Sequence, residues 1–133
     1  MLKSSTICLQ IERSFAEVYP FLADPRQLPN WFPLTKADLT RIEPERWRIV
    51  APQGFRIVTF TPPNPFGILD CSVDSLGYPT RQFVVRAFAN GAGTELHVTL
   101  LQAQGTSDQS FASEVEWFRS DLSALKSYLE PRA

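Results

Sequence analysis

The chain has 133 residues, 44% of them hydrophobic and 20% charged, a composition that excludes a disordered or collagen-like chain. Thirteen basic and fourteen acidic side chains give a net charge of −1, so charge provides no reason to expect nucleic acid or an anionic membrane as a partner. The length favours a single domain over residues 1–133 that is large enough to bury a core.

Cysteine and histidine are too few and too widely spaced for a structural metal site. The chain contains Cys8, Cys71 and His97, with no Cys-x-x-Cys pair. Residues 1–5 have no apolar signal core, and no stretch reaches the roughly 18 apolar residues of a membrane span. Gly-x-Ser-x-Gly, P-loop and Gly-x-Gly-x-x-Gly motifs are also missing from the sequence. We therefore expect a cytoplasmic protein with reduced thiols, without a membrane span, metal or cofactor.

The first residues predict a strand followed by two short helices. Apolar residues alternate with polar ones over Ile7–Ile11, the period of a half-buried strand. Ser14 and Glu17 have the spacing of a capping box, so a helix should begin here and run to about Ala23. Asp24-Pro25 repeats the start signal and predicts a second short helix.

Six further hydrophobic segments separated by turns predict an antiparallel meander. They cover residues 35–42, 46–51, 55–60, 68–75, 81–89 and 94–102. Glycine and asparagine in the turns at 52–54 and 90–93 accept the positive φ angles that tight hairpins need. Consecutive strands are therefore expected to pair with each other.

A long amphipathic helix is predicted to end the chain. Its apolar positions recur in steps of three and four at Phe111, Val115, Phe118, Leu122, Leu125 and Leu129. Ser107 and Asp108 supply an N-cap and a first-turn acid, and Pro131 supplies a stop. The fold class is therefore α+β, with a sheet of about seven strands that holds the terminal helix.

Strand registers that keep apolar side chains together predict which residues point inward. They pair Leu69, Cys71 and Val73 with Ala87, Val85 and Phe83, and these with Leu96, Val98 and Leu100. The same argument predicts an inward set of Leu39, Trp47, Ile49, Phe55 and Ile57, and an outward set of Arg46, Arg48 and Arg56. The terminal helix is the element with enough apolar surface to cover the inward face.

On the opposite face, the same registers place an acid, a base and the histidine in one row. Asp70 is expected opposite Arg86, and Arg86 opposite His97. A carboxylate and a guanidinium can position and polarise an imidazole for acid–base catalysis near neutral pH. The alternative is an exposed cross-strand ion pair worth about 0.2–1 kcal/mol. The register favours the ion pair, because the row faces away from the apolar side.

The order of elements resembles a known superfamily. The runs 11–25 and 28–31, which end in Trp31, resemble the opening of the SRPBCC proteins (START, polyketide cyclase and birch-pollen-allergen-like). Residues 67–70, Arg86, 90–91 and 121–126 fit a bacterial polyketide cyclase-like subgroup, so the resemblance covers the whole chain. It implies a helix-grip fold, a curved antiparallel sheet wrapped around the terminal helix. It also implies a cavity between them that binds lipids, sterols, polyketides or other apolar ligands.

Ten side chains are candidates for lining such a cavity. They are Trp31, Trp47, Phe55, Phe83, Val85, Leu96, Val98, Phe111, Val115 and Phe118. The residues alone are also those of a filled core, whereas the resemblance favours a cavity. Ligand pockets are mostly apolar with a few polar groups that fix orientation, and Arg41, on the Trp47 side near the sheet edge, is one candidate for such a group. The loop over 61–67 is either an ordinary connection or a rim over the cavity, with Phe66 as a plug.

Three functions remain open at this point. The first is binding or transport of a small hydrophobic molecule: a lipid, sterol, quinone, polyketide or aromatic compound. The second is a polyketide cyclase or aromatase-like enzyme, and the third a protein-interaction module of the co-chaperone type. The first is favoured because the inward face supplies few polar groups for an aldol closure and no clear exposed apolar patch is present. We expect a monomer or weak homodimer.

Overall fold

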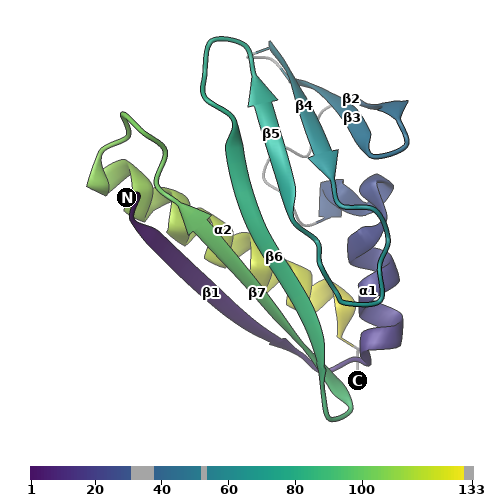
Figure 1. Ribbon diagram of the computed structural model, residues 1–133. Helices are drawn as coiled ribbons and strands as arrows, with labels where there is room; N and C mark the ends of the chain where they lie inside the picture. Colours follow the sequence, from purple (N-terminus) through teal and green to yellow (C-terminus); the bar gives the residue numbers. More distant parts are fainter. Residues whose placement is uncertain (31–37, 52–53, 131–133) are drawn as a thin grey trace.

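A computed structural model describes residues 1–30, 38–51 and 54–130 (Figure 1). Seven strands form one curved antiparallel sheet in the order β1-β7-β6-β5-β4-β3-β2. They are β1 (Ser4–Ile11), β2 (Asp38–Glu43), β3 (Arg46–Ala51), β4 (Gly54–Phe60), β5 (Cys71–Ser75), β6 (Arg81–Asn90) and β7 (Gly93–Leu101). Helix α1 (Phe15–Ala23) and the 3-10 helix η1 (Pro25–Asn30) follow β1, and α2 (Asp108–Leu129) follows β7. This is the α+β helix-grip arrangement that the sequence predicts.

Local hydrogen bonds define where the two α-helices begin. The Ser107 hydroxyl caps α2 by accepting the Ser110 N–H at 3.1 Å, as expected. The capping box predicted for α1 does not form: the Ser14 hydroxyl donates to Glu17 instead, at 3.2 Å. Arg13 also pairs with Glu17, which directs this carboxylate away from the Ser14 amide. Within the described parts of the chain, no helix is long and apolar enough to cross a membrane.

The core lies between the sheet and α2, which crosses behind β1, β7 and β6 in Figure 1. The apolar stripe of α2 is buried along its whole length. Facing it, the inward side chains of β7 alternate with half-buried ones, as a strand with one covered face requires. This layer positions every inward-facing residue discussed below.

The pairing of β6 with β7 is as predicted, whereas β5 is shifted along β6 by two residues. Phe83 lies opposite Leu100 and Val85 opposite Val98, but Cys71 lies opposite Phe83 rather than Val85. Registers that differ by two residues keep every side chain on the same face, so apolar alternation does not distinguish them. Cys71 accordingly remains inward and buried, and burial raises the pKa of its thiol to about 12. A thiol with this pKa is no nucleophile at neutral pH.

The faces of β4 are the reverse of those predicted. Val58 lies opposite Trp47, and Arg56 lies opposite Ile49, so Arg56 and Val58 point inward. Val58 is completely buried, whereas Phe55 is 53% exposed on the outer face and does not line a cavity beneath the sheet. Because β4 has apolar residues on both faces, its sequence does not select the inner one. The register of the β3–β4 hairpin decides.

Candidate functional site

Seven of the ten predicted lining residues meet between the sheet and α2. They are Phe83, Val85, Leu96 and Val98 on the sheet and Phe111, Val115 and Phe118 on α2, all buried. The rings of Phe83 and Phe118 contact each other across the layer, with centroids 5.6 Å apart. Trp47 is half-buried on the inner face of β3, and Trp31 lies outside the described residues.

Burial along α2 is uneven. In its C-terminal half, Leu122 and Leu125 are 1% and 0% exposed. In its N-terminal half, Phe111 and Phe118 retain 8% and 7% exposure, and the facing Phe83 retains 7%. The stripe is therefore buried throughout, and its N-terminal half is slightly less tightly covered than Leu122 and Leu125.

Polar contacts distinguish the two flanks of α2. On one flank, Lys126 Nζ donates to the backbone oxygen of Gln10 in β1 at 2.5 Å. On the other, the Glu114 carboxylate accepts two hydrogen bonds from Arg81 of β6, at 2.5 and 3.3 Å. Asp121 follows two turns later and lies on the same flank as Glu114. This second flank faces away from β1, toward β5 and its neighbours.

Arg81, Glu114 and Asp121 were not singled out by the sequence analysis. Arg81 precedes Phe83 by two residues on β6, so it lies on the same inner face, and its guanidinium lies 5.5 Å from the centre of the Phe83 ring. Burial raises the pKa of the Asp121 carboxyl, and no hydrogen-bond donor among the described residues reaches it. The signal was present in the sequence as two acids seven residues apart beside the apolar stripe of the helix.

Trp47 carries a buried donor for which the described residues provide no acceptor. Its indole Nε1 has no hydrogen-bond partner among the described residues. On the inner face it lies between Arg41 of β2 and Val58 of β4, each directly opposite it in the register. Arg41, the predicted orienting group, therefore does lie on the inner face.

The inner face thus has two chemically different halves. The apolar half consists of β1, β7 and β6 from Phe83 onward, and it packs on α2. The polar half consists of β2 to β5 with Arg81 at the start of β6. It carries Arg41, Arg56, Arg81 and the indole N–H of Trp47 among its apolar side chains.

The outer row of Asp70, Arg86 and His97 forms only in part. Arg86 Nη2 donates to the Asp70 carboxylate at 2.9 Å, although Ile68 and not Asp70 lies opposite Arg86 in the register. His97 lies opposite Arg86 as predicted, but its Nε2 contacts Glu95 at 3.2 Å. All three predicted side chains are partly exposed on the face away from α2. The contacts are those of an Arg86–Asp70 ion pair and a separate His97–Glu95 hydrogen bond rather than one relay.

The loop between β4 and β5 docks on α1. The backbone N–H of Asn64 donates to the Tyr19 hydroxyl at 2.8 Å. Gly67 adopts a φ of 70°, and a Cβ there would lie 1.8 Å from the backbone oxygen of Ala87. Phe66 is 75% exposed, so it does not plug a cavity.

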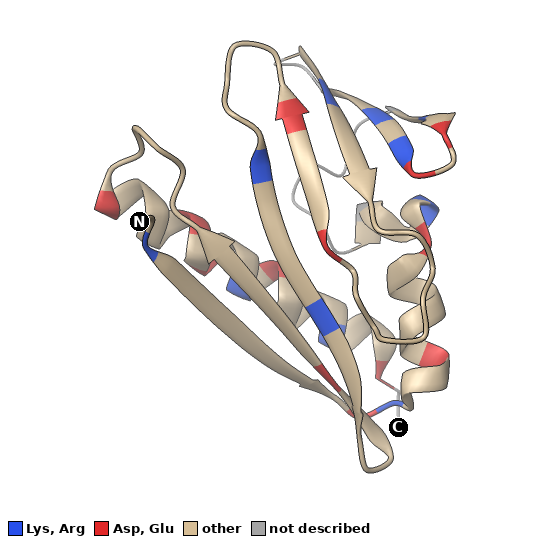
Figure 2. Cartoon of the chain, in the orientation of Figure 1, with Lys and Arg blue, Asp and Glu red and all other residues tan. Residues whose placement is uncertain are grey.

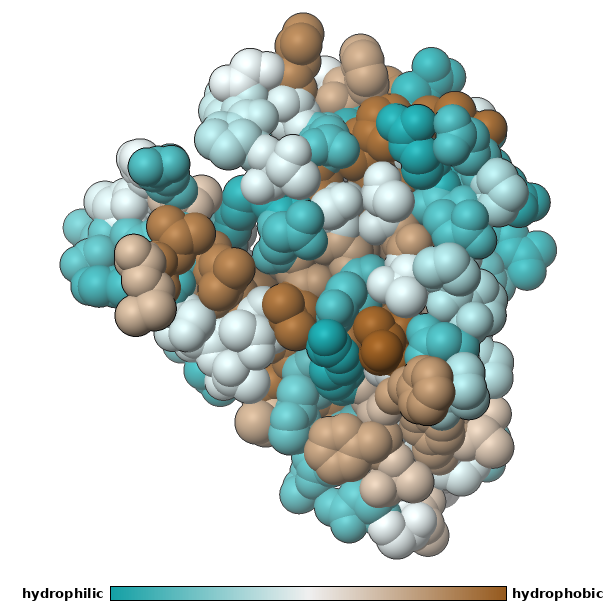
Figure 3. Space-filling model, viewed as in Figure 1, coloured by the Kyte–Doolittle hydropathy of each residue, from teal (hydrophilic) through white to brown (hydrophobic). Residues whose placement is uncertain are grey.

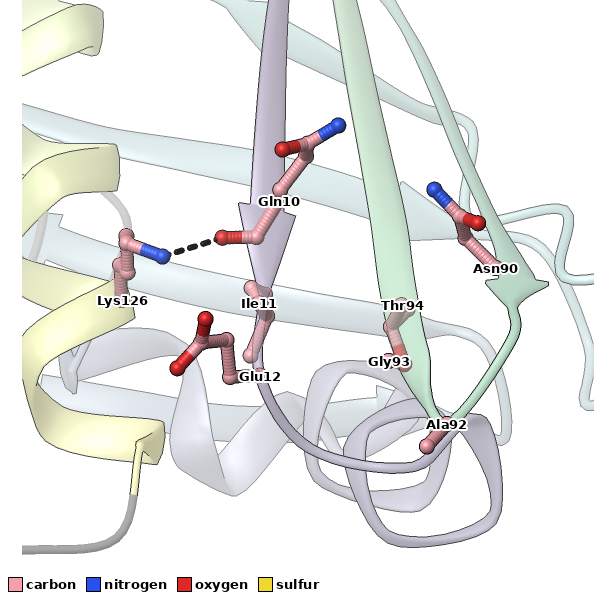
Figure 4. A pocket seen from close by; sticks show the side chains of 8 residues that line it. All are labelled: Gln10, Ile11, Glu12, Asn90, Ala92, Gly93, Thr94 and Lys126. Atoms are coloured by element: carbon pink, nitrogen blue, oxygen red, sulfur yellow. Dashed lines mark hydrogen bonds between the residues drawn. The ribbon is translucent and has the colours of Figure 1, made fainter.

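A pocket of about 360 Å³ opens at the end of β1, beside the β6–β7 hairpin and α2 (Figure 4). It is lined by Gln10, Ile11, Glu12, Asn90, Ala92, Gly93, Thr94 and Lys126. Gln10 and Asn90 both donate to Glu95 at 2.9 Å, and Lys126 donates to Glu130 at 2.6 Å. Because these side chains are already paired, this pocket is a weaker candidate than the inner face.

Exposed apolar residues do not form one large patch on the face seen in Figure 3. Hydrophobic atoms there occur in small groups separated by hydrophilic ones. Scattered exposed apolar side chains are normal for a globular surface. This face therefore does not favour an interaction module.

No family model matches the sequence, and no curated protein does either. Solved structures do match its fold. The Aha1 dimer from Colwellia psychrerythraea is 16% identical over 96% of both chains, with a TM-score of 0.73. CalU16 from Micromonospora echinospora is 20% identical over 98% of this chain and 78% of its own, with a TM-score of 0.68. DynU16, from the dynemicin biosynthetic locus, is 18% identical over 95% of this chain and 46% of its own, with a TM-score of 0.72. The chain therefore shares the helix-grip fold of these proteins.

Proposed function

We propose that the protein binds a small hydrophobic molecule between the inner face of its sheet and α2. The observation that carries this proposal is the buried indole N–H of Trp47, which no described residue accepts. An unsatisfied buried donor costs about 1–3 kcal/mol. A ligand that places an oxygen or nitrogen acceptor beside Trp47 removes that cost.

The aromatic side chains near the N-terminal half of α2 support the same proposal. Phe83, Phe111 and Phe118 supply buried aromatic surface between the sheet and α2. Ligand pockets are mostly apolar, with a few polar groups that fix orientation, and the polar half of the inner face matches this description. Burial of the ligand body contributes about 25 cal/mol per Å² of apolar surface.

Matched ligands test the role of the indole N–H. 2-Acetonaphthone and 2-ethylnaphthalene have similar size, but only the first carries a hydrogen-bond acceptor. We expect calorimetric titration to show tighter binding of the ketone by about fivefold, the value of one hydrogen bond. Trp47→Phe keeps an aromatic ring and should abolish this preference.

Trp117→Phe is the matched control, because Trp117 is exposed on α2. The preference for the ketone should survive in this variant. The proposal would be contradicted if neither naphthalene compound bound and native mass spectrometry found no co-purified small molecule. An equal preference for the ketone in Trp47→Phe and the wild type would contradict the assigned role of Trp47.

A second candidate is a cyclase-like enzyme that acts on the bound molecule. The observation that favours it is the Asp121 carboxyl, whose pKa is raised by burial on the flank of α2 that also carries Glu114. A carboxyl whose pKa is raised by burial is a candidate for general acid–base catalysis. DynU16, which shares the fold, lies in a biosynthetic locus.

The outer row is the competing catalytic proposal. Asp70, Arg86 and His97 would act there on a substrate bound at the sheet surface. If turnover of a linear polyketide is found, its loss in Asp121→Asn and its retention in His97→Ala would assign the chemistry to the inner face. The reverse pattern would assign it to the outer row.

A further inference from the structure

We propose that the ligand carries an anionic group and that Arg41 and Arg56 bind this group beside Trp47. This inference rests on the proposed binding of a small hydrophobic molecule and specifies its chemical class. The class is an amphiphilic anion, with one carboxylate, sulfonate or phosphate on an apolar body.

The strand register places both arginines next to the Trp47 ring. Arg41 lies directly opposite Trp47 on β2. Arg56 is the diagonal neighbour of Trp47 on β4, two residues from Val58. In antiparallel sheets, directly opposite Cβ atoms are about 4.5–5.5 Å apart and diagonal ones about 7–8 Å, within reach of long side chains. Two guanidinium groups and one indole N–H can therefore meet around a single acceptor.

Arg41 and Arg56 have no ion-pair partner among the side chains that the structure describes. Several Lys and Arg positions lie together on β2, β3 and β4 at one end of the sheet (Figure 2). Arg46 in this group pairs with Glu43 at 3.2 Å, and Arg81 pairs with Glu114. No carboxylate whose side chain the structure describes forms an ion pair with Arg41 or Arg56.

The acids of α2 do not supply the missing charge. Glu114 is engaged by Arg81 across the layer. Burial alone raises the pKa of Asp121, and a nearby guanidinium would lower it. The positive charge on the inner face at β2 and β4 is therefore available to a ligand.

The three groups at this end are all donors. Arginine has five N–H donors and no acceptor, and the tryptophan indole has one donor. A carboxylate, sulfonate or phosphate complements this group of donors, because each is negatively charged and offers several acceptor sites. A neutral ketone would satisfy the indole but leave both charges without a partner.

The inner face beside the two arginines also carries apolar side chains that would contact the rest of such a molecule. One row of the register runs from Arg41 through Trp47, Val58 and Val73 to Arg81. It crosses four strand spacings, or about 19 Å. Since Arg41 is exposed and Arg56 half-buried, the charged end would lie at the rim and the apolar body over the valines.

Two fluorescent probes with one body separate the charge from the apolar contact. 8-Anilinonaphthalene-1-sulfonate and N-phenyl-1-naphthylamine share the same ring system, and only the first is anionic. We expect the wild-type protein to bind both probes and to prefer the sulfonate by about tenfold or more. Arg41→Gln combined with Arg56→Gln should remove this preference while the affinity for the neutral probe stays within twofold.

Arg48→Gln is the matched control, because Arg48 is exposed on the outer face of the same hairpin. It should preserve the preference, and Arg41→Lys with Arg56→Lys should keep part of it. Equal affinity of the wild type for both probes would overturn the inference. So would an equal loss of preference in Arg48→Gln, because the effect would then be a general one of surface charge. Binding of neither probe would instead overturn the proposed function itself.

Discussion

The apolar half of the inner face meets α2 through buried side chains, whereas the polar half carries three arginines and an indole N–H that no described residue accepts. Leu96 and Leu125 illustrate the first half, and Arg56 and Trp47 the second. Polar groups among core residues cost stability unless they are paired. In this sheet such polar groups occur on one half alone. The apolar half therefore stabilises the fold, and the polar half carries groups suited to binding.

The largest effect is expected from a cavity in the apolar half. Leu125→Ala removes a side chain with no solvent exposure and should lower the free energy of unfolding by about 2–5 kcal/mol in urea denaturation. Phe118→Leu, in the N-terminal half of α2, should cost less than Leu125→Ala, because a large apolar side chain still fills most of the site. An equal or larger cost for Phe118→Leu would contradict this order.

The next effect concerns the loop that leads into β5, where the two halves join. Gly67→Ala would push a Cβ into the Ala87 carbonyl at a positive φ, so it should destabilise the protein by roughly 2 kcal/mol or more. Gly77→Ala shares the positive φ but has open space around its Cβ. Its cost in the same thermal or urea denaturation should be about 1 kcal/mol. If the two variants were equally stable, the close approach of this loop to β6 would be wrong.

A smaller effect is expected from the contact that ties the polar half to α2. A double-mutant cycle with Arg81→Gln and Glu114→Gln should give a coupling of about 1 kcal/mol, because the pair is bidentate and partly buried. Lys3 and Asp108 form a single, largely exposed contact near the other flank of α2. Their cycle should show no measurable coupling. A larger coupling for Lys3 and Asp108 than for Arg81 and Glu114 would mean that the Arg81–Glu114 ion pair does not hold its flank of α2.

The smallest effect is a difference in pH dependence between two acids of α2. The folded-state pKa of Asp121 is raised by burial, so its contribution to stability is complete at low pH and is lost as the pH rises through that pKa. Asp121→Asn should therefore stabilise the protein at pH 7, by about 0.5 kcal/mol, and have little effect near pH 3.

Asp108 should behave in the opposite way. Hydrogen bonds from Lys3 and Gln102 lower its pKa, so its stabilising contribution is present at neutral pH and is lost as the pH falls. Asp108→Asn should destabilise the protein at pH 7 and not in acid. Denaturation curves at both pH values check the two signs, and equal signs would show that the flanks of α2 do not differ electrostatically.

Much of the inner face could be predicted from local sequence patterns. The steps of three and four from Phe111 to Leu129 identify the buried stripe of α2, and the alternation in β7 identifies its inward residues. Arg56 and Phe55 could not be placed, because apolar residues occupy both faces of β4 and the hairpin register determines which one is covered. The pairing of Arg81 with Glu114 joins residues 33 positions apart, and no local pattern encodes it.

The sequence by itself therefore determined the order of the elements, the α+β class and the apolar stripe of α2, because periodicity, capping and turn residues act over short stretches of chain. The register of β5 on β6, the inner face of β4 and the unpaired donor of Trp47 were decided only by the tertiary structure. Registers that differ by two residues, or strands that are apolar on both faces, satisfy the same local pattern equally well. Only the packing of the whole sheet against α2 and the docked loop distinguishes them.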